Sequence, residues 1–446
     1  MKEATLAQIL DNREARAARQ EQLRCDFSCP ILSFTMNIAG PVKVSALIQR
    51  AFREGLEWIS ARVPEDAIWH REVKVEITGC EALFAVGMDA RGLKNICTDM
   101  EEAAPLGRLF DLDVIDESGE KLSRAVERCC LICGAPGRGC SARRVHSVKE
   151  LQEKTGQIIS QHFAHIDVAK IGAIAKESLL EEVFATPKPG LVDRRNSGSH
   201  RDMDVGTFVK SAEALEGYFV RCVEIGQETA DFPEDVTFSQ LREAGISAEK
   251  DMYRATGGVN THKGAIYSLG VICGALGRLW SAEGAAIPMD RLFPLCSAMA
   301  GPGAAADFAK KRAETAGMRW YLAHGVTGIR GEVSKGFPSL REIALPEFAF
   351  GAKNGLSREE AGIYALLHLI PAMDDTTLLH RGGVEGAKWA KAAVGNLLDS
   401  AQFPTRADIE RLDDAFIARN LSPGGAADLL ALTFFLTTLT EYGFLA

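Results

Sequence analysis

The stretch TPKPGLVD at residues 186–193 separates a long helical pattern from the loops that follow it. Each proline fixes its own φ and biases the residue before it toward extended backbone, so we expect the preceding helix to end near Ala185. Gly190 permits a tight turn or the close approach of a ligand. Lys188 and Asp193 place opposite charges on this stiff loop, and such loops are more often binding sites than spacers. A solvated connector is the alternative.

The pattern is helical on both sides of this stretch. Ser147 and Glu150 have the spacing of a capping box, and helical periodicity continues from there, with interruptions, to about Phe184. After the stretch, Ala- and Leu-rich segments alternate with Gly and Pro loops and contain few β-branched runs. We therefore predict a larger all-α domain over residues 156–446.

The N-terminal third mixes helical and strand patterns. Val44–Val63 has the apolar spacing of an amphipathic helix. Val73–Ile77 and Ala82–Val86 are strand-like runs, and Leu109–Ile115 is another strand candidate. These patterns predict an α+β domain over residues 1–155, joined to the helical domain without a Gly/Ser linker.

Composition limits the class of protein. A chain of 446 residues is too long for one ordinary core, and its net charge of −9 argues against nucleic-acid binding. The first 24 residues lack the apolar core of a signal peptide. The most apolar stretch, Leu429–Leu439, is far shorter than the ~20 residues that span a bilayer. Eleven cysteines in such a chain indicate reduced thiols or metal ligands. We expect a cytoplasmic protein that does not bind membranes.

Two acids lie two residues apart in the Leu109–Ile115 strand. Side chains at this spacing point to the same face, so Asp111 and Asp113 would present both carboxylates together. Such a pair suits Mg²⁺, which takes one or two carboxylates plus phosphate oxygens. The alternative is a pair of solvated acids on an edge strand.

Three cysteines and a histidine follow this strand. Cys130, Cys133, Cys140 and His146 form the ligand set of a closed tetrahedral zinc site, and the first two have the usual spacing. Buried free cysteines beside a surface histidine are the alternative, because cysteine is often a small core residue.

The loop GGVNTHKG at residues 257–264 runs directly into the helical pattern Ala265–Leu276. Glycine-rich backbone before a helix offers free amides and the positive end of the helix dipole to phosphate. Lys263 would add a point charge. The alternative is an ordinary loop and helix cap.

Three further loops share glycine, arginine and aspartate. They contain Arg330, the pair Asp374 and Asp375 ahead of Arg381, and the run SPGGAAD at residues 422–428. In the last of these, Ser422 and Pro423 could be the N-cap and first residue of a helix. Each loop alone is a plausible helix–helix turn, but together they favour one pooled phosphate and metal site.

The N-terminal domain resembles a known transferase family. SFTMNIAGPVK at residues 33–43, GRLFDLDVID at 107–116 and the segment 130–146 are similar to holo-citrate lyase synthase, also called apo-citrate lyase phosphoribosyl-dephospho-CoA transferase, over roughly residues 10–155. The resemblance implies a nucleotidyltransferase-like domain that moves a phosphoribosyl-dephospho-CoA group to a serine of the acyl-carrier (gamma) subunit of citrate lyase, releasing pyrophosphate. Asp111 and Asp113 would then be catalytic, with Lys43 and Arg108 on the phosphates.

The C-terminal domain resembles triphosphoribosyl-dephospho-CoA synthase across about residues 165–446. The similar stretches are TPKPGLVDRRNSGSH at 186–200, GGVNTHKG at 257–264, Gly331-Glu332 and SPGGAADLLA at 422–431. The resemblance implies that ATP loses adenine while its triphosphoribosyl group passes to the 2′-hydroxyl of 3′-dephospho-CoA. This product is the substrate of the other domain. The run between Gly325 and Gly331 is shorter than in the family's relatives.

Displacing adenine from ribose requires an oxocarbenium-like transition state. We expect Asp193 or Asp202 to act as the base or to stabilise this cation, and Asp374 and Asp375 to hold Mg²⁺ on the triphosphate. The residues expected to contact phosphate or substrate are Lys188, Arg194, His200, Asn260, His262, Lys263, Arg330 and Arg381. Either histidine could instead be structural.

Two other functions are consistent with the sequence. The same chemistry could serve malonate decarboxylase, which carries the same prosthetic group. A non-catalytic, zinc-binding adaptor for a carrier protein is the other possibility. For the transferase interpretation of the N-terminal domain, an acidic carrier protein would need a basic face on this acidic chain, for which the candidates are Arg13, Arg16, Arg19, Arg143 and Arg144.

Overall fold

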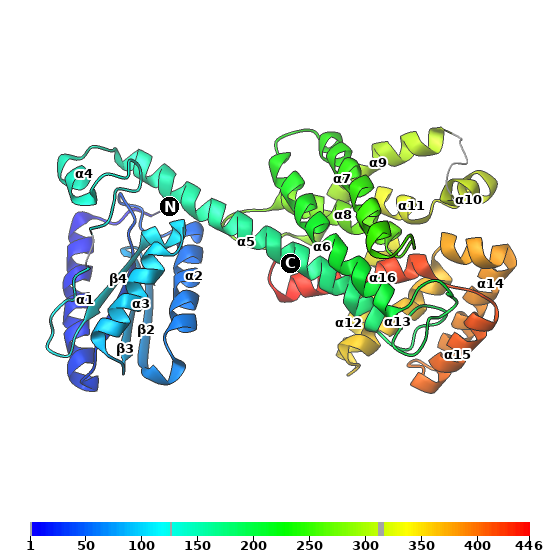
Figure 1. Ribbon diagram of the computed structural model, residues 1–446, viewed down its shortest axis with the longest axis horizontal. Coiled ribbons are helices and arrows are strands. Elements are labelled where there is room, and N and C mark those ends of the chain that lie inside the picture. The colour runs from blue at the N-terminus through cyan, green and yellow to red at the C-terminus, as the bar shows by residue number, and fades with distance from the viewer. Residues whose placement is uncertain (1, 125–126, 311–315) are drawn as a thin grey trace. The chain divides into compact units, whose positions relative to one another are not determined.

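The computed structural model describes residues 2–124, 127–310 and 316–446 (Figure 1). The chain divides into two compact units. The first ends at Ile166 and takes in Ser281–Ala285, and the second comprises Asp167–Trp280 and Ala286–Ala446. The division falls inside one long helix, α5 (Val148–Phe184). The domain boundary at residue 155 stays a prediction.

A four-stranded antiparallel sheet forms the centre of the first unit. Its strands are β1 (Ile31–Met36), β2 (Ile68–Glu76), β3 (Gly79–Val86) and β4 (Phe110–Ile115), in the spatial order β2-β3-β1-β4. All neighbouring strands pair antiparallel. The predicted α+β class is confirmed for this unit, whereas a nucleotidyltransferase-like fold stays a prediction.

Helices cover both faces of the sheet. They are α1 (Leu6–Phe27), α2 (Ala46–Arg62) and α3 (Ala90–Glu102), with the short helices η1 (Glu65–Ala67), η2 (Pro105–Leu109) and α4 (Gly137–Arg143). On one face Phe34 of β1 stacks on Phe52 of α2, with ring centroids 4.8 Å apart. On the other face Ile31 packs in a cluster with Leu23 of α1. Since β1 is buried on both sides, it anchors the unit.

The edge strand β4 is fixed by side chains of α3. The buried ammonium of Lys94 donates to the carbonyl oxygen of Leu112 at 2.9 Å, and the Leu112 amide donates to Glu101 at 2.8 Å. The backbone amide and carbonyl oxygen of Leu112 on this edge strand therefore both have hydrogen-bond partners. These contacts hold β4, and with it Asp111 and Asp113, in one position.

The second unit is helical, as predicted. Besides the last part of α5 it contains α6 (Val205–Glu228), α7 (Glu234–Ala255), α8 (Lys263–Leu279), α9 (Met289–Ala309), α10 (Ala316–His324), α11 (Gly328–Ser334), η3 (Leu340–Ala344), α12 (Leu345–Lys353), α13 (Arg358–Ala372), α14 (Thr376–Ser400), α15 (Arg406–Ala418) and α16 (Gly424–Glu441).

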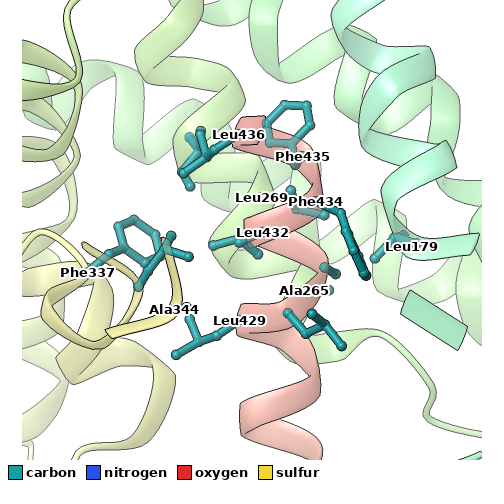
Figure 2. Close-up of a cluster of buried hydrophobic side chains, with 14 of the residues drawn as sticks. Leu179, Ala265, Leu269, Phe337, Ala344, Leu429, Leu432, Phe434, Phe435 and Leu436 are labelled. Carbon is teal, nitrogen blue, oxygen red and sulfur yellow. The ribbon is translucent and has the colours of Figure 1, made fainter. Parts of the chain in front are cut away.

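Helix α16 is the buried centre of this unit. Leu432 and Leu436 point to one side of the helix and Phe434 to the other, and all three are fully buried (Figure 2). A helix that is apolar all round must be surrounded by protein. The most apolar stretch of the sequence is therefore a core helix, and no helix in the described residues is long and apolar enough to cross a membrane.

The TPKPGLVD stretch ends α5 as the prolines predict. The helix stops at Phe184, one residue before the predicted end. Gly190 then adopts φ +69°, and a Cβ there would lie 2.1 Å from the carbonyl oxygen of Leu421. The loop can approach the segment before α16 this closely only because residue 190 has no side chain.

We predict that Gly190→Ala destabilises the protein by at least about 2 kcal/mol. The left-handed backbone alone disfavours alanine by about 1–2 kcal/mol, and the contact with Leu421 adds strain. Chemical unfolding measures this change. The control is Gly395→Ala inside α14, where a Cβ meets no atom within 4 Å and alanine should be neutral or stabilising. Equal stability of the two variants would show that the loop does not require glycine at position 190.

Candidate functional site

The largest cavity of the first unit, about 1060 Å³, contains most of the residues predicted to be functional there. Its walls include Asp111, Asp113 and Arg108, together with Cys130 and His146. Lys43 is not among the described residues that line it, because its ammonium donates to the carbonyl oxygen of Ile38. Burial lowers the pKa of Lys43. The phosphate contact expected of Lys43 is therefore without support in the structure.

The two acids of β4 lie on one face of the strand, as predicted. Asp111 is exposed and pairs in register with Thr35 of β1, whereas Asp113 is half-buried and pairs with Ser33. The ammonium of Lys121 lies 2.5 Å from the Asp113 carboxylate. A carboxylate pair with a cation beside it can bind a divalent ion together with the phosphates that the ion carries.

Two arginines that line this cavity, Arg124 and Arg128, were not predicted from the sequence. Glu101 is almost fully buried and forms ion pairs with Arg124, at 2.7 Å, and with Arg128. Arg128 also donates to the carbonyl oxygen of Phe110 at 2.7 Å. Arg108 donates to the carbonyl oxygen of Cys129 at 2.6 Å. Four arginines, at positions 108, 124, 128 and 144, thus line the cavity with the two acids of β4. Such a set of charges suits a polyphosphate and its metal ion.

The cysteines and histidine predicted to bind zinc come together. One ligand atom from each of Cys130, Cys133, Cys140 and His146 lies within 4.8 Å of all the others. The sulfurs of Cys133 and Cys140 are 3.4 Å apart. A tetrahedral zinc ion with 2.3 Å bonds to sulfur spaces its ligands about 3.8 Å apart. The group therefore fits a zinc ion after small movements.

The electrostatics of this group also suit a metal. Nε2 of His146 is buried without a hydrogen-bond partner. The hydrogen bond to His146 lowers the pKa of the Cys133 thiol to about 6, and the neighbouring Cys133 raises the pKa of Cys140 to about 11. A bound cation would favour the ionised form of these thiols, because it stabilises thiolates.

The basic residues expected to receive a carrier protein are partly neutralised. Arg16 forms an ion pair with Glu81 at 2.8 Å, and Arg19 forms one with Glu72. Both pairs tie α1 to the sheet. Their positive charge is therefore less available to an acidic partner than the sequence suggests.

A smaller cavity of about 160 Å³ in the second unit brings together segments that are far apart in the sequence. Its walls include His200 from the first loop, Asn260, His262 and Lys263 from the second, and Ser422 with Asp428 from the third. The three motifs 186–200, 257–264 and 422–428 thus meet at one place. Arg330 lies instead in another cavity of about 270 Å³, near Asp307, and Lys263 lines both cavities.

Lys188 is not among the described residues that line this cavity, and it forms a buried ion pair with Glu182, which does line it. Its ammonium lies 2.5 Å from the Glu182 carboxylate and also donates to the Glu182 carbonyl oxygen. Lys188 is fully buried, and burial raises the pKa of Glu182 in spite of the lysine. The phosphate contact expected of Lys188 stays a prediction, and the structure shows its charge paired with Glu182.

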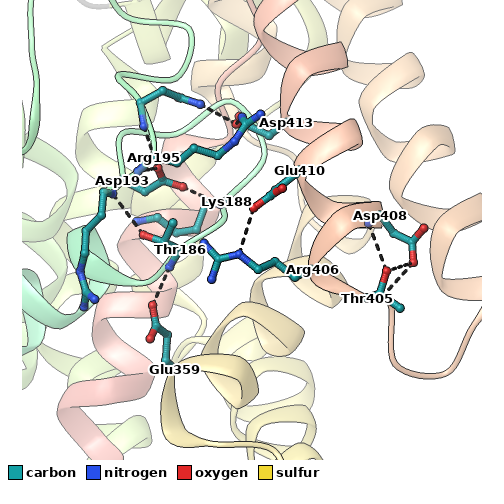
Figure 3. A network of polar contacts seen from close by, with 12 residues as sticks. Thr186, Lys188, Asp193, Arg195, Glu359, Thr405, Arg406, Asp408, Glu410 and Asp413 are labelled. Carbon is teal, nitrogen blue, oxygen red and sulfur yellow. Dashed lines mark hydrogen bonds and ion pairs between the residues drawn. The ribbon is translucent and has the colours of Figure 1, made fainter.

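Asp193 and Asp413 hold the first loop rigid (Figure 3). Asp193 is buried and accepts hydrogen bonds from the backbone amides of Lys188, Arg195 and Asn196, at 2.9, 2.7 and 3.2 Å. Asp413 accepts from the Gly190 amide at 2.9 Å and from two side chains of the same loop. Its backbone contacts make Asp193 a structural residue, and its predicted catalytic role has no support here.

Three further residues predicted to act at this site, Asp202, Arg194 and Arg381, are not among the described residues that line the cavity. Asp202 is 66% exposed and is not among the described residues that line the cavity. The exposed Arg194 lies over the ring of Phe184, 5.3 Å from its centroid. Arg381 donates to the carbonyl oxygen of Ser199 and so helps to hold the loop. Neither Arg194 nor Arg381 lines the described cavity.

The two histidines of the cavity differ in their partners. Nε2 of His200 lies 2.9 Å from the Ser422 hydroxyl, and burial lowers the pKa of His200 to about 4. Nδ1 of His262 lies 2.7 Å from Ser211, which accepts a hydrogen bond from Thr261. Ser211 has its own proton to donate to Nδ1, and in that arrangement the neutral ring carries its proton on Nε2.

His262 therefore offers an N–H group to the cavity. Its side chain is 3% exposed, and Nε2 has no hydrogen-bond partner. Burial, followed by the charge of Lys188, lowers the pKa of His262 to about 3. The ring stays neutral near pH 7 and can donate one hydrogen bond to a ligand.

The two acids predicted to hold magnesium, Asp374 and Asp375, have different partners in the structure. Asp375 is buried and accepts from the amides of Thr377, Leu378 and Ala426 at 2.7–3.2 Å. It therefore caps α14 and holds the start of α16. Asp374 is exposed and forms an ion pair with Lys391 at 2.9 Å. The two neighbouring acids thus lie in different environments, because backbone amides donate hydrogen bonds to Asp375 and the exposed Asp374 pairs with a lysine.

Helix α16 begins one residue later than predicted. Pro423 is the N-cap and Gly424 the first helical residue, whereas Ser422 contacts His200. Sequence reasoning also missed Glu182 and Asp428, both of which line the cavity. The position of Asp428, an acid inside an otherwise apolar helix, is a signal that could have identified it.

Comparison with known proteins gives consistent matches over both units. The family described as ATP:dephospho-CoA triphosphoribosyl transferase matches residues 168–444, and the family described as apo-citrate lyase phosphoribosyl-dephospho-CoA transferase matches residues 4–162. Protein CitXG of Haemophilus influenzae is 36% identical over 97% of this chain and 95% of its own length. Protein CitXG of Leuconostoc mesenteroides subsp. cremoris is 33% identical over 97% of both chains. The 2-(5''-triphosphoribosyl)-3'-dephosphocoenzyme-A synthase of Haemophilus ducreyi is 34% identical over 69% of this chain and 99% of its own.

We predict that Lys188→Met destabilises the second unit by about 3–5 kcal/mol, since it leaves the Glu182 charge buried without a partner. The double variant Glu182→Gln/Lys188→Met should recover much of this loss. Denaturant unfolding measures both. Lys388→Met, which removes an exposed ion pair with Glu385, is the control and should change stability by less than about 1 kcal/mol. A double variant no more stable than Lys188→Met would contradict the assignment.

Proposed function

The chain belongs to the ATP:dephospho-CoA triphosphoribosyl transferase family, with an apo-citrate lyase phosphoribosyl-dephospho-CoA transferase segment ahead of it, and we propose on that premise that it makes and attaches the citrate lyase prosthetic group. The observation that carries this proposal is the similarity to Protein CitXG of two organisms over nearly the full length of all three chains. The two units therefore follow one another in the same order in this chain and in these two relatives. The family names favour citrate lyase over malonate decarboxylase as the destination.

In the first reaction, ATP and 3′-dephospho-CoA give 2′-(5-triphosphoribosyl)-3′-dephospho-CoA and adenine. We assign this step to the 160 Å³ cavity of the second unit. Its volume suits the reacting ribose rather than a whole nucleotide, since cavities for complete ligands usually exceed about 300 Å³. The phosphates would then extend past Lys263 and the N-terminus of α8, where the dipole and the exposed Asn260 favour an anion.

Mg²⁺ is the expected companion of the triphosphate. Asp375 already accepts three backbone amides, so Asp374 and Asp375 do not fit a shared magnesium site. We therefore assign the ion to no residue of this unit.

In the second reaction, the phosphoribosyl-dephospho-CoA group passes to a serine of the acyl-carrier subunit, and pyrophosphate leaves. We assign it to the cavity of the first unit. Asp111 and Asp113 would hold Mg²⁺, which neutralises charge on the departing pyrophosphate. Arg108, Arg124 and Arg128 line the same cavity and would hold the phosphate oxygens. The nucleophile comes from the carrier, so none is required in this chain.

We further propose that Cys130, Cys133, Cys140 and His146 bind one structural zinc ion. Three of these residues, all except Cys133, also line the large cavity. A zinc ion would stabilise the segment from 130 to 146, which forms part of the cavity wall. No open coordination position is needed, because four protein ligands complete a closed site.

The assignment of the two reactions predicts that they can be separated by mutation. Asp111→Asn or Asp113→Asn should lower carrier modification by about 100-fold or more, because transition-state charge is left without its metal, and should leave adenine release unchanged. The matched control is Glu117→Gln, an exposed acid two residues after β4. Adenine is measured by chromatography and carrier mass by mass spectrometry. Loss of both reactions, or of neither, would overturn the assignment.

The zinc proposal predicts about one zinc ion per purified chain by elemental analysis. Cys130→Ser and Cys133→Ser should lose it and should unfold at a lower temperature. Cys129→Ser removes a neighbouring exposed thiol outside the ligand group and should retain the metal. A zinc content near zero in the unmodified protein, or an unchanged content in Cys133→Ser, would show that the thiols bind no zinc.

A further inference from the structure

Asp428 is an acid in a helix that is otherwise almost wholly apolar. Its side chain is surrounded by protein but reaches the 160 Å³ cavity, where it is partly accessible. It lies directly against the start of α8, because a Cβ on Gly264 would be 1.9 Å from Oδ2 of Asp428. The amide of Ala265 donates a hydrogen bond to it. Glycine at position 264 thus allows the carboxylate to approach the helix N-terminus.

The other buried carboxylates near this cavity are occupied. Asp193 and Asp375 each accept three backbone amides. Glu182 lines the cavity but forms the ion pair with Lys188. Of the two acids among the described residues that line the cavity, Glu182 is thus paired with a cation, whereas Asp428 forms no ion pair within the described part of the chain.

An independent observation points to a ligand at the same place. His262 lines the cavity and is only 3% exposed. Its Nε2 atom is buried and has no hydrogen-bond partner. A buried donor without a partner is unfavourable unless a ligand completes it. A carboxylate acceptor and an N–H donor therefore face one small polar cavity, which suits the hydroxyl groups of a ribose.

We propose that Asp428 is the general base of the adenine-releasing reaction; this inference rests on the proposed function. The proton of the 2′-hydroxyl of dephospho-CoA passes to the Asp428 carboxylate as its oxygen bonds to C1′ of the ATP ribose. The C1′–N9 bond breaks, and its electron pair leaves with adenine, which takes a proton from solvent. Asp428 then returns its proton to solvent. The N–H group of His262 positions the substrate by a hydrogen bond.

The surroundings of Asp428 agree with this role. Burial, followed by the charges of Asp375 and Glu182, raises the pKa of Asp428 well above its usual range. A base is most effective when its pKa lies near the working pH. The other described titratable side chains that line the cavity are Glu182, paired with Lys188, Lys263, paired with Glu249, and His200 and His262, whose pKa values burial lowers.

The direct test is Asp428→Asn, assayed for adenine release from ATP and 3′-dephospho-CoA. The loss of a general base should lower kcat by about 10²–10⁴-fold, with KM for ATP within about threefold. Asp399→Asn, an exposed acid of α14, is the matched control and should keep full activity. If the unmodified protein releases no adenine, the proposed function fails. If it does and Asp428→Asn retains kcat within about threefold, this inference alone fails.

Two further measurements distinguish catalysis from a structural role. In the wild type, the rate of adenine release should rise with pH as Asp428 loses its proton. This rise should disappear in Asp428→Asn, and its persistence would overturn the proposal. Thermal unfolding supplies the second. Because the folded pKa of Asp428 is raised, its ionised form opposes folding above that pKa, and this opposition vanishes below its unfolded pKa of about 3.9. Asp428→Asn should therefore melt at or above the wild-type Tm near pH 8, whereas a lower Tm would mark a structural carboxylate.

Discussion

The buried ion pair between Lys188 and Glu182 is the contact on which the second unit depends. It joins the last turns of α5 to the loop that follows, at a point where both side chains are buried. Once Lys188 is fixed, its backbone amide meets Asp193, and Asp193 in turn holds the next residues of the loop. Gly190 then rests on Leu421, just before α16. One pair of charges thus positions a loop, a helix start and the wall of a cavity.

Stability and chemistry make different demands on the acids of this unit. Asp193, Asp375 and Asp413 are buried, but each accepts several backbone or side-chain donors, so their charges help to hold the fold. Asp428 has fewer partners and lies beside other carboxylates. An enzyme tolerates such an unfavourable placement where the charge serves a reaction. The number of donors around each acid therefore separates structural from candidate catalytic residues better than sequence position does.

Local sequence patterns predicted much of the fold, but they did not predict which partner each charged side chain would have. The helix 44–63, the strand 109–115 and the end of α5 were predictable because apolar spacing and proline act locally. Helix α1 was not predicted, because it is mostly polar and buries only Leu23. The spacing of the cysteines and histidine predicted their convergence, since short loops restrict where they can lie. That Lys188 faces Glu182, or that Asp375 caps a helix, depends on tertiary contacts that no local pattern encodes.

The central claim is that one chain carries out both steps. The most direct measurement supplies the purified protein with ATP, 3′-dephospho-CoA and apo acyl-carrier subunit, and follows adenine, pyrophosphate and carrier mass in one reaction. Adenine should appear first, each modified carrier should be accompanied by one pyrophosphate, and omission of dephospho-CoA should abolish both products. Carrier modification without adenine release, or no adenine at all, would contradict the claim.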